Sequence, residues 1–179
     1  MNQKILVHSC CAPCSSSVFE RLSEKYTHLS GFFYNPNIYP ESEYKRRLDE
    51  YVKFAEIMNY KIFVLEDPVE VWDKSVKGFE NEPERGKRCE DCFRLRLEKT
   101  ALFALDNDYN LFTTVLTVSP HKDAAVINKI GIETAHKYGI DFLEADFKKQ
   151  DGYKRSLEIS KEYGLYRQSY CGCKYSIRS

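Results

Sequence analysis

The chain has 179 residues, in which 27 lysines and arginines balance 27 aspartates and glutamates. We expect a single domain over residues 1–179, with a short cysteine-bearing tail from about residue 164. Zero net charge excludes a protein that grips nucleic acid by bulk charge alone, but it permits a local basic patch. We find no apolar run of membrane-spanning length and no signal-peptide layout, so we expect a cytoplasmic protein with no membrane partner.

Short apolar segments alternate with helical patterns along the chain. The segments that predict strands are residues 4–8, 31–34, 61–66, 111–118 and 141–147. Apolar side chains at helical spacing predict helices around residues 18–22, over 41–59, from Cys89 to about Leu105, over 122–138 and over about 152–163. Residues 78–87 are polar, contain proline and glycine, and are typical of an exposed loop.

This alternation predicts the α/β class, with a mostly parallel sheet and helices on both faces. In such folds, sites form beyond the carboxyl ends of the strands, near the switch in strand order. The first cysteines follow the first strand, and Ser119-Pro120-His121 follows the fourth. We therefore expect both segments to lie on the same rim of the sheet.

The seven cysteines fall into three groups: Cys10, Cys11 and Cys14; Cys89 and Cys92; Cys171 and Cys173. An odd number cannot be fully paired within one chain, and disulfides are rare in the cytoplasm. Cysteines that act only as small core residues would be scattered rather than grouped. The pattern therefore indicates metal or redox chemistry.

Each group has features that suit a metal ligand. Cys89 and Cys92 lie three residues apart at a helix start, so they project from one side, and the helix N-terminus favours thiolate. Gly172 lets the backbone bend tightly between Cys171 and Cys173. A closed zinc site and an iron–sulfur cluster would both accept four thiolates, from Cys10, Cys11, Cys89 and Cys92. The three further thiolates favour iron–sulfur, because a structural zinc does not need them.

Five sequence blocks stand in order over nearly the whole chain: HSCCAPC, FYNPNIYP, ERGKRCEDCFRLRLEKTA, TVLTVSPHKD and YRQSYCGC. Together they resemble the QueH family of epoxyqueuosine reductases. The resemblance implies a nucleotide-binding-like fold, related to the adenine-nucleotide hydrolase and PP-loop group, and a [4Fe-4S] cluster. It also implies the last step of queuosine biosynthesis, in which the epoxide of epoxyqueuosine at the tRNA wobble position is reduced to the alkene.

The same resemblance implies roles for individual cysteines. It points to Cys10, Cys11, Cys89 and Cys92 as the cluster ligands. The closing pair, Cys171 and Cys173, is implied to be either a redox-active disulfide or a set of ligands near a second iron.

Removal of the epoxide oxygen as water needs protons and two electrons, so we expect an external electron donor. A single cluster passes one electron at a time. One hypothesis places a mononuclear iron beside the cluster, held by Cys14 with Cys171 and Cys173, or with Cys11. The rival hypothesis stores the electron pair in a Cys171–Cys173 disulfide, whose short ring would make it oxidising.

Three residues are candidates for proton supply: His121, Asp91 and Tyr34. Each has a simpler interpretation, as a helix cap, a first-turn carboxylate and a core residue respectively. His8 is expected to be a strand residue with satisfied hydrogen bonds.

Basic residues gather in two segments, which we expect to form a tRNA-contacting face. Residues 148–179 carry eight basic against three acidic residues, a net charge of +5. The basic residues are Lys148, Lys149, Lys154, Arg155, Lys161, Arg167, Lys174 and Arg178. The second segment surrounds the middle cysteine pair and contains Arg85, Lys87, Arg88, Arg94 and Arg96. An anticodon base could be splayed into a pocket there and stack on aromatic rings.

Two other functions remain open at this point. A PP-loop tRNA thiolase would share the fold, but residues 8–14 contain no glycine for a phosphate-binding loop. A zinc-stabilised RNA-binding module would be colourless, would hold about one zinc, and would leave Cys14, Cys171 and Cys173 without a role.

Overall fold

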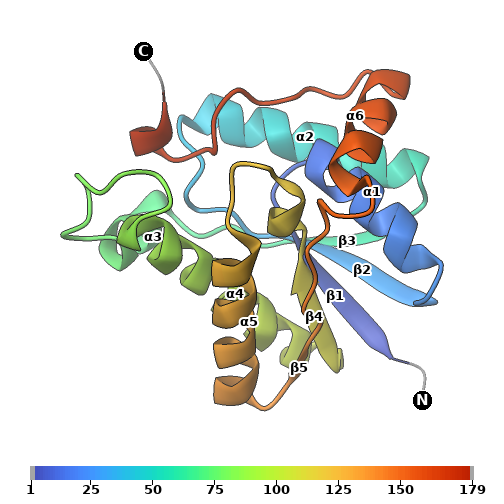
Figure 1. Ribbon diagram of the computed structural model, residues 1–179, viewed down its shortest axis with the longest axis horizontal. Helices are drawn as coiled ribbons and strands as arrows, with labels where there is room; N and C mark the ends of the chain where they lie inside the picture. Colours follow the sequence, from blue (N-terminus) through green and yellow to red (C-terminus); the bar gives the residue numbers. More distant parts are fainter. Residues whose placement is uncertain (1–2, 178–179) are drawn as a thin grey trace.

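One parallel sheet of five strands, in the order β3-β2-β1-β4-β5, organises residues 3–177, the part of the chain that the structure, a computed structural model, describes (Figure 1). The strands are β1 (Lys4–Ser9), β2 (His28–Phe33), β3 (Lys61–Val64), β4 (Leu111–Thr114) and β5 (Asp141–Phe142). The chain runs outward from β1 to β3, then returns to the other side of β1. The switch in strand order therefore lies between β1 and β4, where α/β folds place their sites.

Helices cover both faces of this sheet, as the sequence predicts. They are α1 (Ala12–Ser23), α2 (Glu41–Ile57), α3 (Val69–Ser75), α4 (Lys87–Asp106), α5 (Ala124–Tyr138) and α6 (Gly152–Glu162), with short 3-10 turns η1 (Val115–Val118) and η2 (Lys174–Ser176). In Figure 1, α1, α2 and α6 lie together on one side, while α4 and α5 pack against each other on the other side. None of these helices is both long and apolar enough to cross a membrane.

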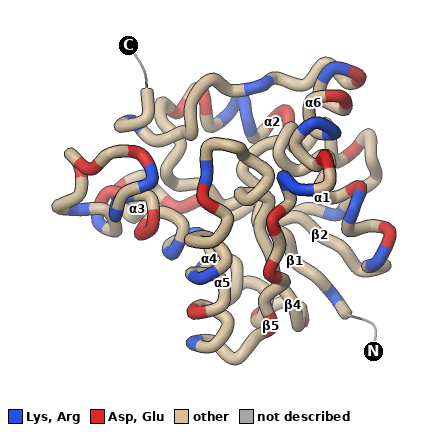
Figure 2. The backbone as a smooth tube through the Cα atoms, viewed as in Figure 1, with Lys and Arg blue, Asp and Glu red and all other residues tan. Residues whose placement is uncertain are grey.

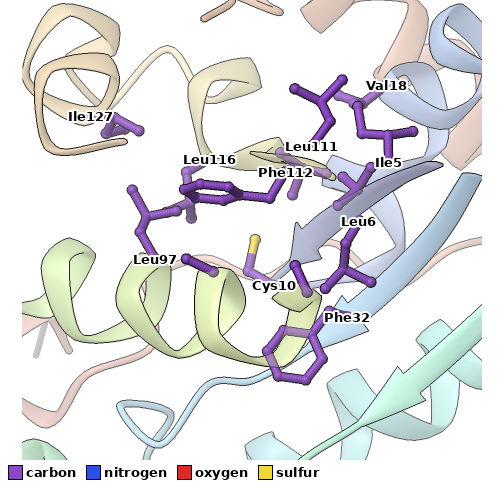
Figure 3. Close-up of a cluster of buried hydrophobic side chains, with 14 of the residues drawn as sticks. Ile5, Leu6, Cys10, Val18, Phe32, Leu97, Leu111, Phe112, Leu116 and Ile127 are labelled. Carbon is purple, nitrogen blue, oxygen red and sulfur yellow. The ribbon is translucent and has the colours of Figure 1, made fainter. Parts of the chain in front are cut away.

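The core lies along the central strand. Residues 5–9 of β1 are buried because helices cover both of its sides. Leu6, Leu97 and Phe112 belong to one buried cluster that also contains Cys10, so the first cysteine group sits directly on the core (Figure 3). A rigid base of this kind fixes the positions of the residues that follow β1 and β4.

The structure shifts the bounds of several predicted elements, among them β2, which begins at His28 instead of residue 31, and β3, which ends at Val64 instead of residue 66. Three differences go beyond the bounds. The fourth strand ends at Thr114 instead of residue 118, because the Thr114 side chain accepts a hydrogen bond from the backbone N–H of Leu116 and starts η1. The fifth strand is only two residues long; Leu143 still donates its backbone N–H to the Phe112 carbonyl, but Ala145 and Phe147 donate theirs to side chains. The short helix α3 was not predicted, and it buries a single large side chain, Trp72.

Candidate functional site

A cavity of about 320 Å³ opens beyond the carboxyl ends of β1 and β4. Its lining includes the thiol-bearing residues Cys14, Cys89 and Cys171, one from each cysteine group. His121 and Lys122, from the loop after η1, also line it. The predicted meeting of the first cysteines with the Ser119-Pro120-His121 segment on one rim is therefore confirmed.

The first cysteine group forms a compact cluster at the end of β1. The thiol sulfurs of Cys10, Cys11 and Cys14 lie within 4.8 Å of one another, and no other trio of metal-type ligands in residues 3–177 is as close. Cys11 is the N-cap of α1 and its sulfur accepts the backbone N–H of Cys14 at 3.4 Å. The Gln168 side chain donates a further hydrogen bond to the same sulfur at 3.1 Å.

These contacts decide which thiol of the first group ionises most readily. Burial opposes ionisation of Cys11, but hydrogen bonds from Cys10, Cys14 and Gln168 bring its pKa well below the ordinary value. The hydrogen bond between Cys10 and Cys11 raises the pKa of Cys10. Hydrogen bonds to both Cys10 and Cys11 raise the pKa of Cys14. Cys11, at a helix N-terminus, is thus the thiol of this group that ionises most readily.

The second and third cysteine groups lie together. Cys92 packs with Cys173 in a buried cluster beside Trp72. Cys89 accepts the backbone N–H of Arg85 at 3.3 Å. Burial raises the pKa of Cys89 and raises that of Cys92 to about 11. In the metal-free protein, burial therefore opposes the thiolate that the helix start is expected to favour.

All seven cysteines lie within the described residues, and none of them forms a disulfide. Cys171 and Cys173 flank Gly172, whose φ of +135° is a conformation that other residues rarely adopt. The tight bend expected at this glycine is therefore present.

Two cations, the buried Arg96 and the half-buried Lys122, face the cysteines, and the sequence does not assign either of them to the sulfur site. Arg96 is 1% exposed and its Nε donates to the backbone carbonyl of Cys92 at 3.3 Å, while its Nη2 has no partner. Burial by itself would lower the pKa of Arg96, but the sulfurs of Cys92, Cys171 and Cys10 raise it wherever they carry negative charge. Helical spacing could have revealed this position, because Arg96 follows Cys92 by one turn of α4.

Lys122 is the second of these cations. It lines the cavity and, although burial opposes its charge, the sulfurs of Cys171, Cys10 and Cys14 raise its pKa wherever they carry negative charge. Lys122 follows His121 directly in the TVLTVSPHKD block. The sequence alone gives no signal that distinguishes this lysine from the other residues of the block.

Only one of the three residues considered for proton supply lies at the cavity. His121 is exposed there, and its backbone carbonyl accepts a hydrogen bond from Arg85 Nε at 2.9 Å. It does not cap α5, whose N-cap is Asp123. Asp91 lies outside the cavity lining and pairs with Lys87 at 2.8 Å, as a first-turn carboxylate.

Tyr34 also lies outside the lining and is fully buried. Its hydroxyl donates to Asp67 at 2.8 Å, and burial raises its pKa. His8 is a satisfied strand residue, as expected, since its ring bonds to Thr114 Oγ1 and to the Tyr34 carbonyl, both at 3.0 Å. Burial lowers the pKa of His8 to about 4, so it is neutral near pH 7.

The basic segments divide into buried and exposed members. Arg88 and Arg96 are buried and bond to backbone carbonyls, so they are not part of a surface that RNA could touch. Arg85 and Arg167 remain exposed and line the cavity. Arg178 lies outside the described residues. Figure 2 shows acidic and basic residues interspersed over the helices, so the basic face is narrower than the charge count implied.

The residues present fit a metal–sulfur group. Free thiols from all three cysteine groups line one cavity, and an anionic metal–thiolate centre would give the buried guanidinium of Arg96, whose Nη2 has no partner, the negative charge that it lacks. The aromatic residues Phe93, Tyr153 and Tyr170 line the rest of the cavity. The site can therefore combine redox-active metal with binding of a flat ring system.

Comparison with known proteins identifies relatives along nearly the entire chain. The family model described as Epoxyqueuosine reductase QueH matches residues 5–179. An epoxyqueuosine reductase QueH from Acinetobacter baylyi is 44% identical over 176 residues, with 98% of this chain and 81% of the relative covered. The corresponding protein of Thermotoga maritima is 36% identical, with 97% and 90% covered.

Two solved structures share the fold. The predicted subunit of a tRNA methyltransferase from Methanocaldococcus jannaschii has a TM-score of 0.55 and 16% identity, and the match covers 88% of this chain and 75% of that one. The U34-tRNA thiolase NcsA from Methanococcus maripaludis, solved with its [4Fe-4S] cluster, has a TM-score of 0.57 and 12% identity, with 100% and 63% covered. At these identities the likeness extends to the fold alone, which agrees with the nucleotide-binding-like architecture expected from the sequence.

Proposed function

The chain belongs to the epoxyqueuosine reductase QueH family and is an oxidoreductase, and we propose that it reduces epoxyqueuosine in tRNA at the cavity beside its cysteines. In that reaction the two C–O bonds of the epoxide break, a C=C bond forms, and the oxygen leaves as water after uptake of two electrons and two protons. The observation that carries this proposal is the convergence of thiols from all three cysteine groups on one cavity.

We propose a [4Fe-4S] cluster with Cys10, Cys11, Cys89 and Cys92 as its ligands. Cys10 and Cys11 come from the end of β1 and the other two from the first turns of α4, so they approach from two sides. The ligands of a cluster each bind a different iron, so they need not be as close as the Cys10–Cys11–Cys14 trio. When bound, such a cluster supplies electrons one at a time.

The remaining thiols account for the second electron in one of two ways. Cys14 and Cys171 line the cavity and, with Cys173 or Cys11, would hold an adjacent mononuclear iron. Alternatively, Cys171 and Cys173 cycle between dithiol and disulfide. Anaerobically prepared protein with about five irons per chain supports the second iron, whereas about four supports the disulfide.

The chain's own charged groups have defined tasks in this scheme. Arg96, buried among the sulfurs, stabilises negative charge at the centre, and so does Lys122 from the cavity side. His121 and Lys122, in the loop after η1, both line the cavity and carry titratable side chains, and we assign proton delivery to this pair. Asp91 and Tyr34, which lie away from the cavity, are not part of this assignment.

The substrate base would enter from a single-stranded anticodon loop. Phe93, Tyr153 and Tyr170 provide rings on which a splayed base can stack, and Arg85 and Arg167 provide phosphate contacts at the cavity. The partner is therefore tRNA that carries epoxyqueuosine at the wobble position. An external electron donor and a cytoplasmic location complete the proposal.

The direct test is conversion of epoxyqueuosine tRNA by protein purified without oxygen, with a chemical reductant and with mass spectrometry of the digested tRNA. We expect queuosine from the unmodified chain and none from Cys89→Ser. The matched control, Lys61→Gln, changes an exposed residue at the amino end of β3, away from the cavity, and should convert substrate normally. Equal activity of Cys89→Ser and the unmodified chain would contradict the proposed site.

A further inference from the structure

The position of Cys171 depends on side chains, because its segment has no regular structure of its own. Residues 165–173, between α6 and η2, form neither helix nor strand. Backbone groups of such a segment need partners elsewhere, and these partners determine where it lies. Figure 1 shows this segment running past α2, an element that contains no cysteine.

Arg47 of α2 supplies the main contacts. Its side chain is only 1% exposed, and its Nε donates to Glu43 at 2.7 Å. The two remaining guanidinium nitrogens bond to consecutive carbonyls, Nη1 to that of Cys171 at 3.0 Å and Nη2 to that of Tyr170 at 3.1 Å. A buried guanidinium that uses all three nitrogens holds the backbone in both position and orientation, which a lysine cannot do.

Gly172 lets the backbone approach this guanidinium closely. A Cβ atom on Gly172 would lie 3.2 Å from Arg47 Nη1, and the φ of +135° is unfavourable for any side chain. The Gly172 carbonyl also accepts the backbone N–H of Tyr39 at 2.8 Å. The segment is therefore fastened on either side of Cys171 while that residue still lines the cavity.

We infer that Arg47 is a positioning residue for the sulfur site: it holds the Cys171 backbone so that this thiol stays at the cavity with the first cysteine group. The influence of Cys10 and Cys11 on the pKa of Arg47 agrees with a location between that group and the tail, although burial opposes the charge of the guanidinium. The geometry stands without any metal, and only the iron measurement below rests on the proposed function.

The test is site-resolved alkylation of the full-length chain. Arg47→Lys keeps the charge and a possible ion pair with Glu43, but it cannot bond to both carbonyls. Reduced protein, purified without oxygen and then stripped of metal, is treated with iodoacetamide, and mass spectrometry gives the rate at each cysteine. We expect Cys171 to react about tenfold faster in Arg47→Lys, and Cys14 and Cys89 to change by less than about twofold.

Gly172→Ala is the second variant, and it should give the same selective rise because it disturbs the same contact from the tail. The matched control is Arg155→Lys, an arginine that makes paired hydrogen bonds to Glu20 and none to the tail, and it should leave every rate unchanged. An unchanged Cys171 rate in Arg47→Lys would overturn the inference. So would a uniform rise at all seven cysteines with a lower Tm, because Arg47 would then stabilise the fold as a whole.

Iron content, measured on the same preparations before stripping, keeps this inference separate from the proposed function. We expect less iron in Arg47→Lys and Gly172→Ala than in the unmodified chain, with the Arg155→Lys content unaltered. An unmodified chain that binds no iron would contradict the proposed function, yet the alkylation pattern would still decide the role of Arg47.

Discussion

Arg96 should affect the metal-free and metal-loaded protein in opposite directions. The perturbation is Arg96→Met, which keeps much of the side-chain length and removes the charge. In the metal-free protein the guanidinium is buried with an unpartnered Nη2, and the raised pKa values of Cys92 and Cys10 leave those thiols neutral near pH 7. Arg96→Met therefore removes a buried charge that has no balancing negative charge in the metal-free protein, so we expect Tm to stay the same or rise.

In the metal-loaded protein that we propose, the same side chain would face an anionic centre. Unit charges about 5 Å apart, at an effective dielectric constant of about 20, attract each other by about 3 kcal/mol. Because Arg96 is almost completely buried, solvent screening reduces this value little. Arg96→Met should therefore weaken metal binding by about a hundredfold, and it should make the centre harder to reduce.

The assay is loss of the iron absorption band under a chelator, followed without oxygen, together with thermal melting of the stripped protein. Arg94→Met is the matched control: it lies on the same helix but is 37% exposed and pairs with Glu133. We expect Arg96→Met to lose iron much faster than this control while melting no lower. Equal retention of iron by the two variants would refute the idea that Arg96 balances the charge of the centre.

Three further results are expected. Because the pKa of Cys92 is raised to about 11 from 9.0, the metal-free fold has its full stability below pH 9 and loses up to about 3 kcal/mol as pH rises through 11. Thermal melting of Cys92→Ala over this range should depend less on pH than melting of the unmodified chain, and parallel curves for the two proteins would contradict this. Gly131→Ala should lower the free energy of unfolding by about 1–2 kcal/mol in denaturant titrations, because the added Cβ would lie 2.3 Å from the Phe142 ring, and a second substitution, Phe142→Leu, should restore part of the loss. A Gly131→Ala variant as stable as the unmodified chain would refute the clash. Arg167→Gln at the cavity should weaken tRNA binding and lower its salt dependence, whereas Lys4→Gln at the opposite end of β1 should not; equal affinities would exclude Arg167 from the interface.

The sheet was predictable because its central strands are buried on both sides and read as apolar runs. The interruptions were harder to predict. LFTTVLTV has strand-forming residues throughout, yet the Thr114 hydroxyl ends the strand halfway by capping a 3-10 turn. The segment 141–147 lies at the edge of the sheet, where β4 is its only neighbouring strand, and only Asp141–Phe142 pairs with β4 as a strand. Local propensity does not contain either piece of information.

The site was predictable as far as the cysteines and the rim on which they meet. The tail position was not, because no periodicity relates residue 171 to residue 47; the contact depends on a buried arginine in a helix that carries no cysteine. Arg88 and Arg96 were taken for surface charges, although each lies one helical turn from Cys92 and shares its buried face. A charge count along the chain cannot distinguish a buried guanidinium from an exposed one, whereas helical spacing can.

The central claim is that the cysteines hold iron and sulfide that reduce the substrate. Absorption and metal content of protein purified without oxygen test it most directly. The account predicts a brown protein with a broad band near ~400 nm that bleaches with dithionite, about four or five irons per chain, and sulfide. Colourless protein that contains only zinc, even after anaerobic reconstitution with iron and sulfide, would contradict it.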